Sequence, residues 1–344
     1  MIERLNIRQK TEEKEESLSP FAVKSRQSRG RQKQEEPCPI RTVFQRDRDR
    51  IIYSKAFRRL KYKTQAFIAP QGDHYVTRLT HTLEVSQIAR TISRALNLNE
   101  DLTEAVAMGH DLGHTPFGHT GEEVLNKIYS GGFRHNEQSL RIVELLENDG
   151  IGLNLTWEVR DGILNHSKSG VDILGKDWGE VNTLEGEIVK ISDAVAWINH
   201  DIDDAMRAGV ITEDDLPASS GEVLGNSHSE RVNAMVGDII EQSWAVREGN
   251  TEKPGIKMSP EVAGAAEIMR EFLFDRVYNR QAAEEEATRA REIVSLLYEY
   301  YNKHQDKLPP EYSFYSDETE RRVVDYIAGM TDRFAMELAE AIKG

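Results

Sequence analysis

The stretch GHDLGHTPFGHTGE, residues 109–122, concentrates histidine more than any other part of the chain. The chain has 10 histidines in 344 residues, and four of them fall between positions 110 and 135. At the end of a helix, His110 and Asp111 can direct a neutral imidazole and a carboxylate toward one point. A divalent cation binds this mixture of donors when it also keeps positions open for water. The stretch therefore predicts a metal site.

Helical patterns flank this stretch. Upstream, a helix that carries His81 in its middle is predicted by apolar residues at near-helical spacing: Leu79, Leu83, Ile88, Ile92 and Leu96. A second predicted helix, with apolar positions over 102–108, runs into Asp111. Thr120 and Glu123 have the spacing of a capping box, which predicts that a further helix starts there. His81 thus offers a second imidazole to the site.

A later helix, predicted over residues 184–208, provides the fourth candidate ligand, Asp193. Its core stripe repeats every three or four residues: Ile188, Ile191, Val195, Ile198 and Ile202. On another face, Asp193, Trp197 and Asp201 follow one another at intervals of four. These three residues form either one wall of a pocket or a solvated acidic face with a half-buried tryptophan. The spacing alone does not decide between the two.

The rest of the chain also has helical patterns. Further helices are predicted over residues 136–148, 155–166, 230–247, 260–279, 283–303 and 317–342. The sequence Leu308-Pro309-Pro310 separates the last two, and a polar loop lies near 211–228. We find no run of alternating β-branched residues bounded by turns, so the predicted fold class is all-α.

The two ends of the chain differ in composition. Residues 1–36 are highly charged and poor in branched apolar residues, which predicts a mobile N-terminal arm. Its basic segment KSRQSRGRQK (24–33) is either a solvated tail or a contact to phosphates or to a neighbouring subunit. Residues 37–344 are predicted to form a single helical domain, with a metal core over about 50–210 and a C-terminal helical part over about 230–344. The apolar faces of that C-terminal part either complete a larger core or meet a partner subunit.

Composition restricts the function classes. Charged residues make up 30% and hydrophobic residues 38% of the chain, as in ordinary globular proteins. The sequence has no apolar run of the length of a membrane span and no secretory signal, and its single cysteine fits a reducing cytoplasm, where we expect the protein. A net charge of −15 makes nucleic acid a secondary candidate partner. A small anionic substrate needs only a local basic pocket.

Several motifs together resemble a known family. His81, His110-Asp111 and Asp193 match the H…HD…D signature of the HD superfamily of metal phosphohydrolases. The resemblance extends to its deoxynucleoside triphosphate triphosphohydrolases through FQRDRDRI (44–51), FRRLKYKTQAF (57–67), TRLTHTLEVSQIAR (77–90), GHDLGHTPFGHTGE (109–122), FRHNEQSLR (133–141), SDAVAWINHDIDDA (192–205) and DYIAGMTDRF (325–334). It implies an all-helical HD domain with additional C-terminal helices. It also implies cleavage of a dNTP, with dGTP as one candidate, to deoxynucleoside and inorganic triphosphate.

The same resemblance implies roles for single residues. The implied ligands of a divalent metal ion (Mn²⁺, Mg²⁺, Co²⁺, Zn²⁺ or Fe²⁺) are His81, His110, Asp111 and Asp193. His119 and Glu122 take the positions of an acid–base pair, and His114 and His135 lie on the phosphate side. A histidine paired with a carboxylate can stay protonated and can protonate a departing oxygen.

The substrate contacts implied by the resemblance include one departure from the family pattern. Gln65 and Asp201 match residues that hold the ribose 3′-OH, and Arg78 matches a phosphate contact. At position 197 relatives commonly carry tyrosine, whereas this chain has Trp197. Because an indole donates one N–H and accepts nothing, the usual contact of this position with the sugar is in doubt. The indole ring of Trp197 can still form a flat wall against the sugar. Basic residues around 58–63 can also screen the triphosphate charge.

Other interpretations stay open at this point. Within enzymes, the alternative is another HD phosphohydrolase, a 5′-nucleotidase or a cyclic-dinucleotide phosphodiesterase. A different class is a non-catalytic nucleotide sensor or nucleic-acid-binding module. The resemblance also implies a homo-oligomer, a tetramer or hexamer, with a dNTP activator at a subunit interface. For His166, His200 and Asp204 the pattern assigns no definite role, and a structural role is favoured for His166.

Overall fold

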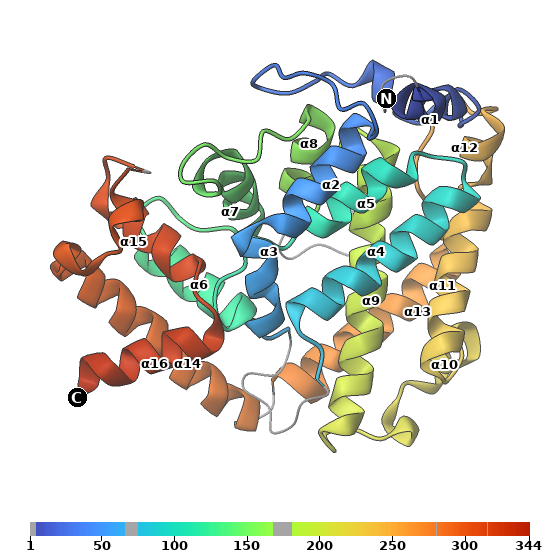
Figure 1. Cartoon of the computed structure of the whole chain (residues 1–344). Helices are drawn as coiled ribbons and strands as arrows, with labels where there is room; N and C mark the ends of the chain where they lie inside the picture. The colour runs from blue at the N-terminus through green and yellow to red at the C-terminus, as the bar shows by residue number, and fades with distance from the viewer. Residues whose placement is uncertain (1–4, 66–74, 168–180, 280, 315) are drawn as a thin grey trace.

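The computed structural model describes residues 5–65, 75–167, 181–279, 281–314 and 316–344 (Figure 1). Within these residues the secondary structure is helical, and β-pairing is limited to two isolated bridges, Arg31 with Thr156 and Thr64 with Thr77. The helices are α1 (Ile7–Glu15), α2 (Val43–Tyr53), α3 (Lys55–Arg59), α4 (Arg78–Ala95), α5 (Glu100–Gly109), α6 (Gly118–Ile128), α7 (His135–Arg141), α8 (Trp157–Asn165), α9 (Leu184–Arg207), α10 (Ala218–Leu224), α11 (His228–Gln242), α12 (Trp244–Glu248), α13 (Pro260–Leu273), α14 (Gln281–Lys303), α15 (Thr319–Ala328) and α16 (Asp332–Lys343). The prediction of an all-α fold is confirmed.

The larger core lies between α2, α4, α5, α8 and α9, which cross in the middle of the molecule (Figure 1). All five residues of the predicted stripe on α9 are buried in it: Ile188, Ile191, Val195, Ile198 and Ile202. On α4, Ile88 and Ile92 are buried as predicted, but Leu83 is exposed. The buried face of α4 runs instead through His81 and Val85, so the site lies on the packed side of the helix.

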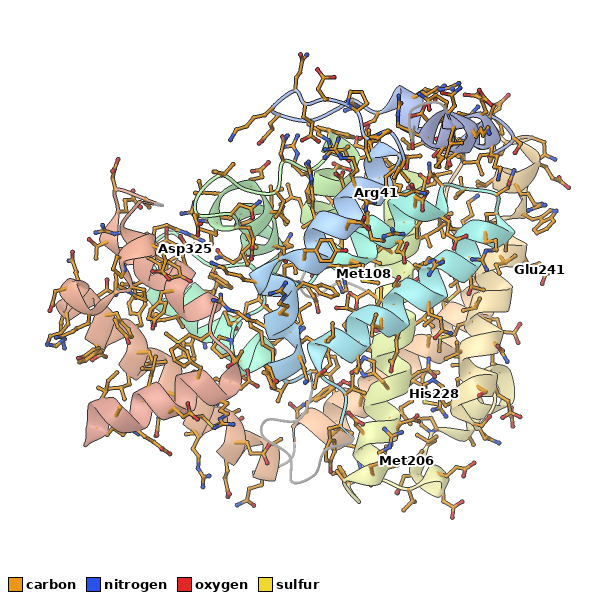
Figure 2. The ribbon with its side chains drawn as sticks, viewed as in Figure 1. Arg41, Met108, Met206, His228, Glu241 and Asp325 are labelled. Atoms are coloured by element: carbon orange, nitrogen blue, oxygen red, sulfur yellow. The ribbon has the colours of Figure 1, made fainter. Side chains whose placement is uncertain are left out.

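A second core lies at the C-terminal end of the molecule, between α6, α14, α15 and α16 (Figure 1). The segment predicted as one helix over 317–342 is two helices, because α15 ends at Ala328 and Thr331 caps α16. This part is tied to α7 by Asp325, labelled in Figure 2, which accepts hydrogen bonds from Arg141 at 2.7 Å and from Gln138 at 3.1 Å.

The helices after residue 228 bury most of their apolar faces inside the chain itself. Met235, Ile239, Met269 and Leu273 join the larger core, and Leu297 joins the second core. The predicted helices over 230–247 and 260–279 are both interrupted, by Ser243 and by a π-helical turn over Phe274–Tyr278. The predicted polar loop near 211–228 contains the short helix α10. No helix among the described residues has the length and apolarity needed to cross a bilayer.

The N-terminal segment, predicted as a mobile arm, makes defined polar contacts. Its described part, residues 5–36, packs on the larger core through buried polar contacts. Glu15 accepts hydrogen bonds from the backbone and hydroxyl of Ser25, at 2.6 and 2.7 Å. Arg31 pairs with the buried carboxylate of Asp47. Three basic residues of the segment thus pair with carboxylates of the chain, namely Lys24, Arg26 and Arg31. Composition alone does not reveal such pairing.

Candidate metal centre and active site

Three helices bring the four predicted metal ligands together. His81 lies on α4, His110 and Asp111 follow the end of α5, and Asp193 lies on α9. Nε2 of His81 lies 3.1 Å from Oδ1 of Asp193 and 3.8 Å from Oδ2 of Asp111. Nε2 of His110 lies 3.5 Å from Oδ1 of Asp111. We call these four residues the metal cluster.

The protonation of the metal cluster suits a divalent ion. Burial lowers the pKa of His81, which keeps its imidazole neutral near pH 7. Burial opposes the charge on Asp111, but His114, His110 and Arg78 hold the pKa of its carboxyl well below the usual range. Burial likewise opposes the charge on Asp193, and His81 outweighs it, so this pKa is also low. Imidazoles and carboxylates are ordinary donors for a divalent cation.

The orientation of His110 supports the same assignment. Its Nδ1 donates to the carbonyl of Ala107 at 2.7 Å, so the lone pair is on Nε2. Nε2 is buried and has no hydrogen-bond partner among the described residues. A buried nitrogen left without a partner is costly unless it has a ligand. His110 therefore fits a metal ion held by the cluster.

Glu122 joins two histidines beside the metal cluster. Its Oε2 lies 3.1 Å from Nδ1 of His119, and its Oε1 lies 2.9 Å from Nδ1 of His135. Burial opposes the charge on Glu122, but His135 and His119 hold the pKa of its carboxyl well below the usual range. Burial lowers the pKa of His135, but Glu122 outweighs this effect and the pKa is raised. His114 stacks on His135 with ring centroids 4.0 Å apart, and its Nε2 lies 3.2 Å from Asp111.

The backbone before α6 sets the position of His119. The helix begins at Gly118, two residues earlier than the predicted capping box, and Glu123 instead pairs with Lys127 one turn later. Phe117 has a φ of 62°, in the left-handed region that bulky residues rarely adopt. Its amide donates to Asp332 at 3.0 Å, which fixes this conformation. His119 is 73% exposed as a result, on the open side of the site.

Arg78 is a buried cation with free donors. Its Nη1 donates to Oδ2 of Asp111 at 2.8 Å. Its Nε and Nη2 have no hydrogen-bond partner among the described residues, although the side chain is only 1% exposed. A Cβ at Gly118 would lie 2.8 Å from Nη2, so glycine leaves room for the guanidinium there. Arg78 can therefore donate to an anion beside the metal cluster.

A cavity of about 290 Å³ lies next to His119. We call it the Trp197 cavity, and its lining consists of Thr64, Gln65, Phe117, His119, Thr120, Trp197, Asp201, Phe274 and Tyr278. Trp197 and Tyr278 lie nearly parallel, at 23° and 6.2 Å between centroids. The hydroxyl of Tyr278 donates to Oδ2 of Asp201. The interpretation of Trp197 and Asp201 as a pocket wall is thus the one that the structure supports.

The basic residues around 58–63 do not line this cavity. Lys63 is buried, and its ammonium group donates to the carbonyl of Ala328 at 2.8 Å and to that of His114. Burial lowers its pKa to about 7. Arg59 lines a separate cavity with Lys55 and Tyr312. Lys63 therefore supports the loop that carries His114, and the prediction that it screens a triphosphate has no support in its position.

Comparison with known proteins identifies the family. The HD domain matches residues 78–198, and the phosphohydrolase-associated domain matches residues 256–341. A deoxyguanosinetriphosphate triphosphohydrolase-like protein of Caldanaerobacter subterraneus subsp. tengcongensis is 56% identical over 335 residues, which cover 96% of this chain and 94% of the relative. Proteins of the same name from Desulfatibacillum aliphaticivorans and Clostridium perfringens (strain SM101) are 51% and 50% identical, over 96% and 92% of this chain and 96% and 91% of theirs. The chain belongs to the family of deoxyguanosinetriphosphate triphosphohydrolase-like proteins.

Membership in this family indicates a hydrolase built on an HD domain. HD domains generally bind divalent metal ions, and the cluster of His81, His110 and Asp111 could hold one. A solved structure of a hypothetical protein from Aquifex aeolicus aligns with a TM-score of 0.47 and 20% identity, over 85% of this chain and 67% of that chain. A likeness at this distance adds nothing to the assignment.

The structure also brings residues to the site to which the sequence patterns assigned no definite role. Tyr278 and Phe274 reach the Trp197 cavity from the part of the chain that matches the phosphohydrolase-associated domain. His166 is buried with its Nε2 3.3 Å from that of His135, so it faces the site and not only the core. His200 contacts His81. For Tyr278 the only available signal was an aromatic residue in a helical pattern, which is far more often a core residue.

Proposed function

We propose that this protein is a metal-dependent hydrolase that cleaves a deoxynucleoside triphosphate to a deoxynucleoside and inorganic triphosphate. The observation that carries the proposal is the position of the His119–Glu122 pair, between the metal cluster and the Trp197 cavity. The name of the relatives makes dGTP the first substrate to test. A 5′-nucleotidase and a phosphodiesterase remain secondary alternatives, because the relatives carry the name of a triphosphohydrolase.

The residues of the metal cluster that would hold the ion are His81, His110, Asp111 and Asp193. A divalent ion held there would lower the pKa of water and would neutralise charge on the phosphate under attack. Arg78 has two donor nitrogens without partners and would bind phosphate oxygens. His114 and His135 stack on each other, and His114 contacts Asp111. These two histidines would line the phosphate side of the site.

His119 would protonate the departing 5′-oxygen. Because its Nδ1 faces Glu122, its Nε2 is the nitrogen available to the substrate. The carboxylate of Glu122 would hold the imidazole in the orientation that proton transfer to the 5′-oxygen requires. Since a bond from the α-phosphate to the 5′-oxygen breaks, the products are a deoxynucleoside and an intact triphosphate.

The Trp197 cavity would bind the deoxynucleoside. Gln65 and Asp201 line it and would hold the 3′-OH, and Oε1 of Gln65 has no partner among the described residues. Trp197 offers a flat wall, and the adjacent Tyr278 supplies a phenol on the same wall. We therefore propose that Tyr278 compensates for the phenol that is absent at position 197.

A product assay tests the proposal. The protein is incubated with Mn²⁺ and each of the four dNTPs, singly and in mixtures, and the products are separated by anion-exchange chromatography. We expect equimolar triphosphate and deoxynucleoside from at least one dNTP. Orthophosphate with dNDP, or pyrophosphate with dNMP, as the first products would refute it. Hydrolysis of dNMP but not of dNTP would favour the 5′-nucleotidase alternative.

A further inference from the structure

His81 of the metal cluster contacts a second buried histidine, His200. Nδ1 of His81 lies 2.9 Å from Nε2 of His200, and the rings meet edge to face at 84°. His200 lies on α9 and is 2% exposed. The other histidine of the metal cluster is held differently, because Nδ1 of His110 donates to a backbone carbonyl. The orientation of His81 thus depends on a side chain.

The role of His81 fixes the protons of both rings. Nε2 of His81 faces Asp193 and Asp111, so a metal ion would bind this nitrogen. Nδ1 of His81 then carries the hydrogen and donates to Nε2 of His200. With a metal ion on His81, His200 would accept at Nε2 and would carry its own hydrogen on Nδ1, the nitrogen that faces Asp201. A histidine that binds a metal usually needs such a partner for its other nitrogen.

The chain of contacts continues into the Trp197 cavity. Nδ1 of His200 lies 2.7 Å from Oδ1 of Asp201, close enough for strong attraction although the N–H is not aligned as in a regular hydrogen bond. Oδ2 of Asp201 accepts the hydroxyl of Tyr278. Both Asp201 and Tyr278 line the cavity. The nearby Asp204 is already engaged by Arg207 and by the backbone of Val76.

We propose that His200 is a positioning residue that holds His81 in its metal-binding orientation and links the metal cluster to Asp201 in the Trp197 cavity. The inference rests on the proposed function, because it assumes a metal ion on His81 and a deoxynucleoside on Asp201. A link of this kind is reciprocal. A deoxynucleoside that orders Asp201 strengthens metal binding, and a bound metal strengthens deoxynucleoside binding by the same factor.

Manganese binding without substrate tests the positioning role. The apparent Kd of Mn²⁺ is measured from the electron paramagnetic resonance signal of free Mn²⁺, with folding checked by circular dichroism. We expect His200→Leu to bind Mn²⁺ roughly 10–100-fold more weakly than the unchanged protein. His200→Gln keeps an acceptor for His81 and should bind more tightly than His200→Leu. Asp201→Asn should also weaken Mn²⁺ binding, although Asp201 touches no residue of the metal cluster in the described contacts.

His228 provides a matched control. His228, which is labelled in Figure 2, lies on α11 and pairs with Asp203 of α9 at 2.8 Å. Among the described contacts it has none with His81. His228→Gln removes a histidine–aspartate pair that involves α9, the helix that also carries His200. We expect this variant to bind Mn²⁺ with unchanged affinity. Asp201→Asn preserves the shape of the side chain, so it decides the question if His200→Leu does not fold.

The link is tested with 2′-deoxyguanosine, which has no phosphate to reach the metal directly. We expect it to lower the Kd of Mn²⁺ in the unchanged protein but not in His200→Leu or Asp201→Asn. Wild-type Mn²⁺ affinity in both variants, or the same effect of 2′-deoxyguanosine in all proteins, would overturn the inference and leave the proposed function intact. If the unchanged protein binds no Mn²⁺, the metal cluster itself and the proposed function fail.

Discussion

His119 and Glu122 lie one turn apart at the start of α6, with Nδ1 of the imidazole 3.1 Å from Oε2 of the carboxylate. Glu122 is mostly buried, whereas His119 faces the Trp197 cavity. The buried Glu122 therefore holds the exposed His119, and Nε2 is the imidazole nitrogen that does not face Glu122. This is the arrangement that a general acid needs.

Substitutions of this pair are expected to affect the rate more than binding. His119→Ala should lower kcat by roughly 10²–10⁴, because it removes the proton donor, and should change KM little. The exposure of His119 means that this change has little effect on folding. Single-turnover kinetics and dNTP binding in the presence of Ca²⁺ measure the two effects separately. A variant with wild-type kcat would exclude His119 as the acid.

Chelation and substitution test the metal cluster. EDTA should abolish activity, and Mn²⁺, Co²⁺ or Mg²⁺ should restore it to different extents. His110→Ala should give a folded but inactive protein, because it removes the buried Nε2 that has no hydrogen-bond partner among the described residues and leaves the backbone of the site unchanged. Asp111→Ala should also be inactive and less stable, since it leaves buried Arg78 without its carboxylate, at a cost of roughly 3 kcal/mol. Full activity of Asp111→Ala would contradict the site.

Glu185 predicts a pH dependence of stability. It accepts the amides of Val23 and Asn99, both at 3.0 Å, and so ties the N-terminal segment to the start of α5. Burial raises its pKa to about 7, against ~4.3 in an unfolded chain. Its protonated form is thus favoured by folding. This contribution is complete below pH ~4.3 and is lost as the pH rises through about 7, on the order of 3 kcal/mol.

Glu185→Gln should remove this dependence, because an amide accepts the same two bonds without titrating. Urea denaturation of both proteins at several values between pH 5 and pH 8 measures the difference. We expect the variant to gain stability relative to the unchanged chain as the pH rises. An equal slope for the two proteins would show that Glu185 is ionised in the folded state throughout.

Assembly and control are a further prediction. Although most C-terminal apolar faces are buried within the chain, several large apolar side chains stay exposed, among them Tyr53, Tyr62, Phe274 and Phe334. We expect a homo-oligomer, a tetramer or hexamer, whose hydrolysis of one dNTP responds to another. Light scattering with and without dNTPs measures the mass. A mass near 39.1 kDa under every condition, with hyperbolic kinetics unaffected by other dNTPs, would contradict this prediction.

The metal cluster could be predicted from the sequence because its residues carry a local signal. His110 and Asp111 are adjacent, and the apolar stripe of α9 places the helix that carries Asp193 against the core. On α4 the stripe was less reliable, because Leu83 is exposed and the buried face runs through His81. Roles for Tyr278 and His200 could not be predicted, since they arise from contacts between α9, α4 and a π-helical turn that no periodicity encodes.

The contacts of the N-terminal segment also could not be predicted from the sequence. Its charges suggested a mobile arm, but Arg31 pairs with Asp47, and Glu15 accepts hydrogen bonds from Ser25. Amino-acid composition gives the number of charged residues but not which of them lie close together in the fold. The start of α6 was misplaced for a similar reason, because Asp332, more than 200 residues away, holds Phe117 in a conformation that the local sequence does not favour.

The central claim is that water attacks the α-phosphate and the 5′-oxygen leaves with the deoxynucleoside. Hydrolysis of dGTP in ¹⁸O-labelled water, followed by mass spectrometry of both products, tests it most directly. We predict one ¹⁸O atom in the inorganic triphosphate and none in the deoxyguanosine. Label in the deoxyguanosine, or label in orthophosphate as the first product, would contradict the claim.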